Sequence, residues 1–169
     1  MLSKQQCNDL YRKHAPGAFR RAQRLLANSS DADDVVHDVF LTLFERYGQY
    51  RGTSSISTYV YSAITHACLN RLRNRRRRAG LARAQLFVKP SYDPGGGPEA
   101  WAAARSLLER LPEQLAEVAV YHYLDELSQR EIASILGCSH THVAELIARL
   151  SRWIAQQEPS VHADAERTR

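Results

Sequence analysis

The stretch from residue 128 to residue 149 reads SQREIASILGCSHTHVAELIAR. Its first four residues predict the start of a helix, because Ser128 and Glu131 have the types and spacing of a capping box. The apolar residues that follow stop at Gly137, the residue type that most often ends a helix in the left-handed conformation. Ser139 then caps a second helix. The stretch therefore predicts two helices joined by a tight turn.

This pair of helices is typical of a helix-turn-helix, in which the second helix lies in the major groove of DNA. Ala133 is small where the two helices must approach each other. At 100° per residue, one face of the second helix points inward and carries Val143, Ile147, Leu150 and Ile154. Leu146 lies at the edge of that face, where it can extend the core. The alternative to a DNA-binding motif is a plain corner of two helices.

The remainder of the chain has helical periodicity nearly everywhere, which predicts an all-α fold. A capping box at Ser3 and Gln6 opens the first helix, and we expect Pro16-Gly17 to interrupt it. Ser30 or Asp31 is expected to cap the next helix, which ends at Gly48. The apolar stripe of this helix consists of Val35, Val36, Val39, Phe40, Leu43 and Phe44.

A long helix is predicted after the polar loop of residues 49–57, with Val60, Ile64, Cys68 and Leu72 on one face. Two further helices follow, one with Trp101, Leu107, Leu108 and Leu111, the other, begun by Pro112, with Leu115, Val118, Ala119 and Tyr123. Residues 81–97 contain two prolines and three consecutive glycines, which predicts a flexible linker. The chain is thus divided into two small helical domains, residues 1–80 and 98–155, and a polar tail from residue 156 to residue 169.

The distribution of charge distinguishes the two halves of the 169-residue chain. Residues 1–80 contain 14 Lys and Arg against 6 Asp and Glu, a net charge of +8, whereas residues 99–155 contain 5 against 8, a net charge of −3. Six arginines fall within residues 71–78, and Arg suits the geometry of phosphate better than Lys does. The chain therefore carries its electrostatic signal for a polyanion in the N-terminal half. The alternative is an ordinary solvated helix face.

Several classes of function and location are disfavoured. We expect neither a transmembrane helix nor a signal peptide, because no apolar run is long enough for either. Three widely spaced cysteines argue for free thiols in a reducing compartment, the cytoplasm. No metal site is expected, since Cys138, His140 and His142 are too closely spaced at a helix start to converge on zinc. No catalytic constellation and no phosphate-binding glycine loop is present, so neither enzymatic activity nor a cofactor is predicted.

Residues 128–149 resemble region 4 of bacterial sigma factors. The segments LLERLP at 107–112 and YLDELS at 123–128 support the resemblance, as does DADDVVHDVF at 31–40, which is similar to region 2.2. Residues 50–61 resemble the promoter-reading segment that follows. Two small domains joined by a linker match the extracytoplasmic-function (ECF) subgroup, and the resemblance covers about residues 8–78 and 99–155.

The resemblance implies partners and site residues. Core RNA polymerase would contact acidic residues of the region 2.2 helix, namely Asp33, Asp34, Asp38 and Glu45. The minus-10 promoter element, melted and with an extruded base, requires polar groups, aromatic faces and cations. Those types are provided by Arg51, Ser54, Ser55, Thr58, Tyr59, Tyr61, Asn70, Arg71 and Arg73. Core packing is the alternative role for Tyr59 and for Tyr61.

The minus-35 element would be contacted by the second domain, through Ser128, Arg130, Ser139, His140, Thr141, His142, Glu145, Arg149 and Arg152. The family pattern usually has Lys and Arg where this chain has Ala144, Leu146 and Ser151, and Arg and Asn where it has Ser62, Thr65 and His66. We therefore expect residues 99–155 alone to bind DNA weakly. The resemblance also implies an anti-sigma factor as a partner. Two other functions stay open: a stand-alone helix-turn-helix regulator, and a degenerate sigma homologue that acts as a protein-interaction adaptor.

Overall fold

The structure is a computed structural model that describes residues 3–47, 55–81 and 97–157. Within these ranges every regular element is a helix, which confirms the predicted all-α class. The chain forms two compact units, Met1–Glu113 and Gln114–Arg169. All three cysteines are free thiols. None of the helices in the described ranges combines the length and the apolar character needed to span a bilayer.

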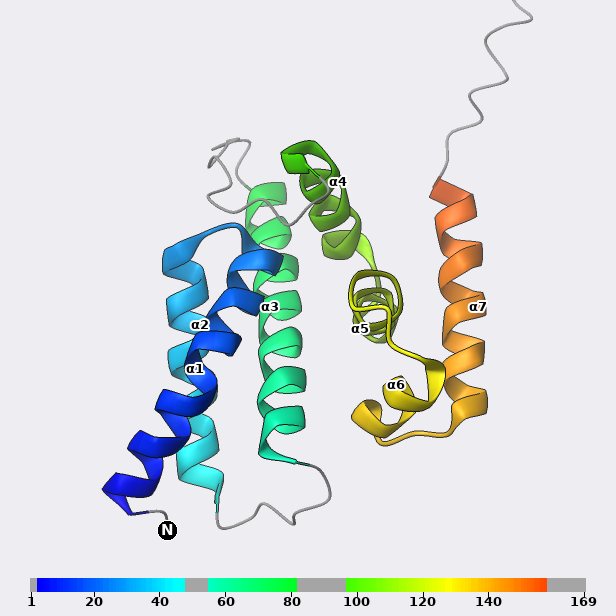
Figure 1. Cartoon of the computed structure of the whole chain (residues 1–169). Coiled ribbons are helices and arrows are strands. Elements are labelled where there is room, and N and C mark those ends of the chain that lie inside the picture. The colour runs from blue at the N-terminus through cyan, green and yellow to red at the C-terminus, as the bar shows by residue number, and fades with distance from the viewer. Residues whose placement is uncertain (1–2, 48–54, 82–96, 158–169) are drawn as a thin grey trace, which may run out of the picture. The chain divides into compact units, whose positions relative to one another are not determined.

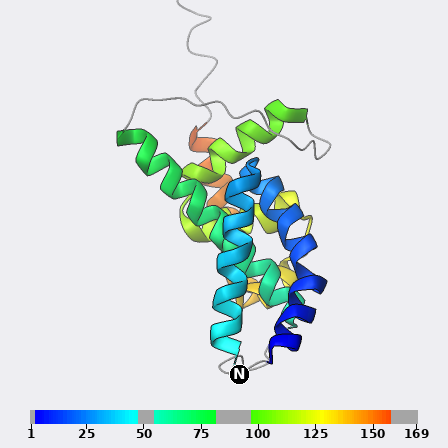
Figure 2. The same cartoon turned by 90° about the vertical axis from the view of Figure 1, so that its left-hand side faces the viewer.

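The first unit is built on three helices that pack side by side: α1 (Lys4–Leu26), α2 (Ser29–Arg46) and α3 (Ile56–Leu81) (Figures 1 and 2). The predicted apolar stripe of α2 is buried, apart from Phe44, which is half-buried. The predicted inner face of α3 is buried as well, and Leu69 joins it. From α1 the core receives Ala15, Ala18, Ala22, Leu25 and Leu26.

Two local predictions for these helices are wrong. Helix α1 continues through Pro16 instead of stopping there. Pro16 is exposed, so the helix loses one backbone hydrogen bond on its solvent side, while Ala15 and Ala18 stay packed in the core. Helix α2 is capped by Asn28, whose side chain accepts a hydrogen bond from the backbone N–H of Asp31, and not by Ser30 or Asp31 itself.

Helix α4 (Gly97–Arg110) packs against α3 and belongs to the first unit by its contacts, whereas the sequence-based division begins the second domain at residue 98. Its Trp101 is buried, and the guanidinium of Arg24 from α1 lies 4.9 Å from the ring centroid. Leu108 and Leu111 are buried too, as their spacing predicts.

The second unit contains α5 (Glu113–Ala119), a π-helical turn η2 (Val120–Leu124), α6 (Gln129–Leu136) and α7 (His140–Gln157). The first residue of α5, Glu113, still belongs to the first unit. The π-turn is closed by a hydrogen bond of 3.0 Å from the N–H of Asp125 to the carbonyl of Val120. A π-turn contains more residues than an α-turn, so it shifts the side chains that follow. Tyr121, three residues after the buried Val118, is buried, whereas Tyr123, named among the residues of the predicted helix, is 53% exposed.

Candidate nucleic-acid interface

The helix-turn-helix of the second unit has the caps that the sequence predicts. The Ser128 hydroxyl accepts a hydrogen bond from the N–H of Glu131, and the Glu131 carboxylate accepts one of 2.8 Å from the N–H of Ser128. The Ser128 hydroxyl also donates a hydrogen bond of 2.6 Å to the Glu131 carboxylate, and this bond, together with the one from the Ser128 N–H, lowers the pKa of the Glu131 carboxyl. Gly137 ends α6 with φ of 64°, in the left-handed region. The predicted turn is therefore confirmed residue by residue.

The second helix of the motif, α7, divides cleanly into an inner and an outer face. The hydroxyl of Ser139 accepts a hydrogen bond of 3.1 Å from the N–H of His142, which caps the helix as predicted. Val143, Leu146 and Leu150 are buried, so Leu146 extends the core, whereas Ile147 and Ile154, also predicted to face inward, are half-buried. All nine residues predicted to contact the minus-35 element are exposed. His142 and Glu145 lie 3.7 Å apart on this outer face, and Arg149 and Arg152 are its cations. Their DNA contacts stay a prediction.

The outer face of α2 is acidic. The four residues predicted to contact polymerase, Asp33, Asp34, Asp38 and Glu45, are all exposed. Leu41 lies between Asp38 and Glu45 on the same helix and is 46% exposed, so this acidic face has an apolar residue that the sequence analysis did not single out. Its position one turn from Asp38 is the signal that could have identified it.

The start of α3 brings together part of the predicted minus-10 set. Ser55 precedes the helix, and its hydroxyl accepts a hydrogen bond of 3.0 Å from the N–H of Thr58. The two hydroxyls of Ser55 and Thr58 lie 2.9 Å apart. Tyr59 is half-buried one residue further on. Arg51 and Ser54, predicted for the same site, lie outside the described residues.

Tyr61 is fixed by a residue that the sequence analysis missed. The guanidinium of Arg21, on α1, lies 3.8 Å from the centroid of the Tyr61 ring. Arg21 Nε also donates a hydrogen bond of 2.7 Å to the hydroxyl of Thr65, which is fully buried. The Thr65 hydroxyl in turn donates to the carbonyl of Tyr61. Because 44 residues separate Arg21 from Thr65, no local pattern could have indicated this contact.

Arg71 of α3 is held by two aspartates of α2. Its Nε and Nη2 atoms donate hydrogen bonds of 3.0 Å and 2.6 Å to Asp31, and Nη2 lies 2.8 Å from a carboxylate oxygen of Asp34. Arg75, one turn further along α3, pairs with the other oxygen of Asp31 at 3.0 Å. The hydrogen bond to Asp31 raises the pKa of Arg71. Asp34, predicted to contact polymerase, and Arg71, predicted to contact DNA, are thus bonded to each other.

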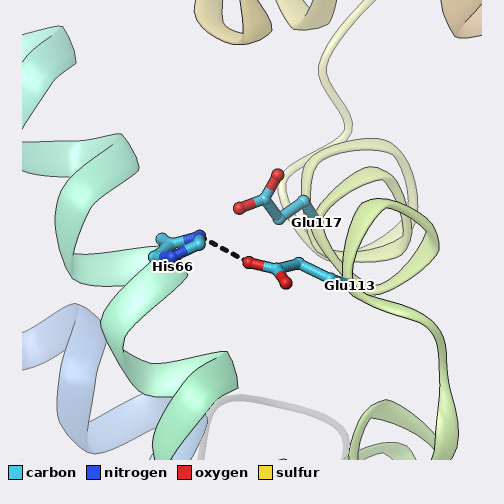
Figure 3. Close-up of side chains that lie close together, drawn as sticks. All are labelled: His66, Glu113 and Glu117. Carbon is cyan, nitrogen blue, oxygen red and sulfur yellow. Dashed lines mark ion pairs between the residues drawn. The ribbon is translucent and has the colours of Figure 1, made fainter.

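Arg73 also forms hydrogen bonds within the first unit. It donates hydrogen bonds to Asn70 at 2.8 Å and to Glu113 at 3.0 Å. Glu113 additionally forms an ion pair with His66 at 3.3 Å, which Figure 3 shows as a dashed line. The hydrogen bond from Arg73 lowers the pKa of the Glu113 carboxyl. Arg73 and Asn70, both predicted to contact the minus-10 element, are therefore brought together, with Arg73 bonded to an acid.

Comparison with known families matches both halves of this arrangement. The sequence profile of Sigma-70 region 2 matches residues 10–78, and that of Sigma-70 region 4 matches residues 101–152. The two profiles cover the three-helix bundle and the helix-turn-helix in the order in which sigma factors have them. The chain belongs to the ECF sigma factors. Members of this family are transcription initiation factors and not enzymes.

Curated ECF relatives extend the similarity over most of the chain. This chain is 28% identical in sequence to the ECF RNA polymerase sigma factor SigM of Mycobacterium tuberculosis, over 88% of this chain and 75% of the relative. It is 26% identical to the RNA polymerase sigma factor YlaC of Bacillus subtilis, over 88% of this chain and 90% of the relative. Among solved structures, the sigma factor RpoE from Bartonella quintana, crystallised with the anti-sigma factor NepR, matches with a TM-score of 0.51. That match has 14% identity, covers 85% of this chain and 92% of the other, and supports the fold alone.

Proposed function

We propose that this ECF sigma factor binds core RNA polymerase, recognises a two-part promoter and helps to open the DNA for transcription initiation. The observation that carries the proposal is the co-occurrence, in one chain and in family order, of a region 2 bundle and a region 4 helix-turn-helix. The names of the relatives, which are RNA polymerase sigma factors, support the same partner. The nucleotide chemistry of transcription belongs to the polymerase.

In this proposal the exposed acidic face of α2 binds core polymerase. Asp33, Asp34, Asp38 and Glu45 are exposed on a helix whose opposite face is buried, and Asp34 also pairs with Arg71. The start of α3, with the hydroxyls of Ser55 and Thr58 and the ring of Tyr59, contacts the minus-10 element. The outer face of α7 contacts the minus-35 element.

The outer face of α7 supports a supplementary contact with DNA. Its two arginines, Arg149 and Arg152, are accompanied by Glu145, which repels phosphate. Because phosphate contacts supply most of the affinity for DNA, the second unit depends on polymerase to hold it at the promoter. The anti-sigma factor seen with RpoE of B. quintana is the basis on which we propose such a partner for this chain.

Charge reversal on α2 tests the polymerase contact. Asp38→Arg is expected to weaken the affinity for core polymerase by about tenfold or more, since like charges brought together at an interface cost several kcal/mol. Asp9→Arg, an equal change at an exposed position of α1, is the matched control and should leave the affinity unchanged. Fluorescence anisotropy of the labelled protein, titrated with core enzyme, measures both. Equal affinities for wild type and Asp38→Arg would refute the placement of this surface.

A further inference from the structure

The six arginines of α3 fall into two sets that differ in their partners. Arg71, Arg73 and Arg75 are paired with carboxylates of Asp31, Asp34 and Glu113. Arg76, Arg77 and Arg78, which we call the arginine tip, are exposed and form no hydrogen bond or ion pair with the described residues. The acidic residues of the first unit thus pair with one half of the arginine run, and the other half is exposed to solvent.

The position of the arginine tip along α3 makes it accessible. Leu72 is the last residue of the run with a buried side chain, and every side chain from Asn74 to Arg78 is exposed. Consecutive residues of a helix point about 100° apart, so the three guanidinium groups of the tip spread over most of the helix circumference. A polyanion can therefore approach them without displacing an ion pair to any residue that the structure describes.

Solvation of a helix end explains the arginine tip only in part. One cation near a helix C-terminus stabilises the helix through its dipole. Further like charges beside it repel each other. Arg76 is near one acid, Glu109, whose pKa burial raises even though Arg75, Arg76 and Arg105 act to lower it. Arg77 and Arg78 have no such compensation among the described residues. Three adjacent guanidinium groups do match a chain of phosphates, each of which accepts bidentate hydrogen bonds from Arg.

We propose that the arginine tip, Arg76 to Arg78, contacts the phosphodiester backbone of promoter DNA, while Arg71 and Arg73 hold α3 against its neighbours. The inference rests on the proposed function, since it assigns a task within promoter binding. It changes the set of residues expected to bind DNA: the phosphate contacts lie at the end of α3 and not in its paired middle. An arginine already bonded to two aspartates must lose those bonds before it binds a phosphate, whereas Arg77 and Arg78 have no carboxylate partner to lose among the described residues.

Salt dependence of DNA binding separates the two sets of arginines. Each phosphate contact to single-stranded DNA contributes about 0.7 to the slope of log K against log salt concentration. For the full chain and a fluorescein-labelled single-stranded oligonucleotide of mixed sequence, Arg77→Gln combined with Arg78→Gln should reduce that slope by about 1.4. Arg71→Gln should leave the slope unchanged and lower the unfolding temperature. Arg12→Gln combined with Arg20→Gln removes the same charge from exposed positions of α1 and serves as the control.

Three results would overturn the inference. In the first, Arg71→Gln reduces the salt slope and the tip variant does not; in the second, the tip variant and the α1 variant reduce the slope by the same amount. In the third, the wild-type chain shows no salt-dependent binding of the oligonucleotide. Binding to phosphatidylglycerol vesicles is measured in parallel. If the tip variant loses vesicle binding but keeps DNA binding, the inference is also overturned. Binding to core polymerase, measured separately, reports on the proposed function. A tip variant that binds core normally but has an unchanged slope refutes the inference alone.

Discussion

The two units of this sigma factor are ordered by different interactions. In the first unit, Asp31 of α2 bridges Arg71 and Arg75 of α3, residues 40 or more positions away in the sequence. In the second unit, the turn of the helix-turn-helix is fixed by hydrogen bonds of short range, such as those between Ser128 and Glu131. Pairing across helices is weakened by salt, whereas a capped turn depends on the local backbone. The first unit should therefore respond to ionic strength and the second to changes at its caps.

The largest expected difference between the units comes from one substitution made in each. Gly137→Ala places a side chain on a residue with φ of 64°, where an added Cβ meets no atom within 4 Å, so the loss of about 1–2 kcal/mol comes from backbone strain alone. Gly17→Ala lies inside α1, where alanine is favoured by about 0.5–1 kcal/mol over glycine. Thermal unfolding should show opposite signs. Destabilisation by both substitutions would contradict the assigned backbone conformations.

Breaking the charge bridge of the first unit is expected to cost less. Asp31→Asn removes the negative charge that Arg71 and Arg75 share, together with one of its two acceptor oxygens, and should lower the free energy of unfolding by about 1 kcal/mol at low salt. Asp33→Asn, two residues along α2 and exposed, is the control with the same change in charge. Denaturant titrations in about 0.05 M and 1 M salt measure the difference. A loss that does not shrink in high salt would show that these ion pairs are not what joins α2 to α3.

The smallest effect is a dependence on pH in the second unit. The pKa of Glu131 is lowered from its ordinary value near 4.5 by hydrogen bonds from Ser128. A carboxyl with a lowered pKa in the folded state stabilises it above the unfolded pKa, and this contribution is lost as pH falls below about 5 towards 3. Glu131→Gln should remove that part of the acid sensitivity. The capping box of α1 contains Gln6 in place of an acid, so Gln6→Ala should not change the pH dependence.

Local signals in the sequence predicted the second unit well and the first unit less completely. The capping box at Ser128, the left-handed Gly137 and the burial of Leu146 follow from residue types within one turn of each other. The π-turn at Val120–Leu124 was missed because nothing in the residue types of that segment marks the added residue.

In the first unit the apolar stripes were predicted and the charge pairs were not. Periodicity shows which side of α2 and α3 is buried, but it cannot show that Arg71 meets Asp31 or that Arg21 covers Tyr61. Those contacts depend on how helices pack across the bundle. The predicted minus-10 arginines were chosen from the family resemblance and from residue type. The structure shows Arg71 and Arg73 paired with carboxylates, while Arg51 lies outside the described residues.

Run-off transcription tests the central proposal most directly. Core RNA polymerase is incubated with the full chain and genomic DNA fragments, and the transcripts are mapped. The account predicts transcripts from defined start sites that require both the chain and the core enzyme. Binding of DNA fragments without core would instead indicate a stand-alone regulator, and binding of core without transcripts would indicate an adaptor. Either result, in the absence of promoter-specific transcripts, would contradict the assignment of this chain as an initiation factor.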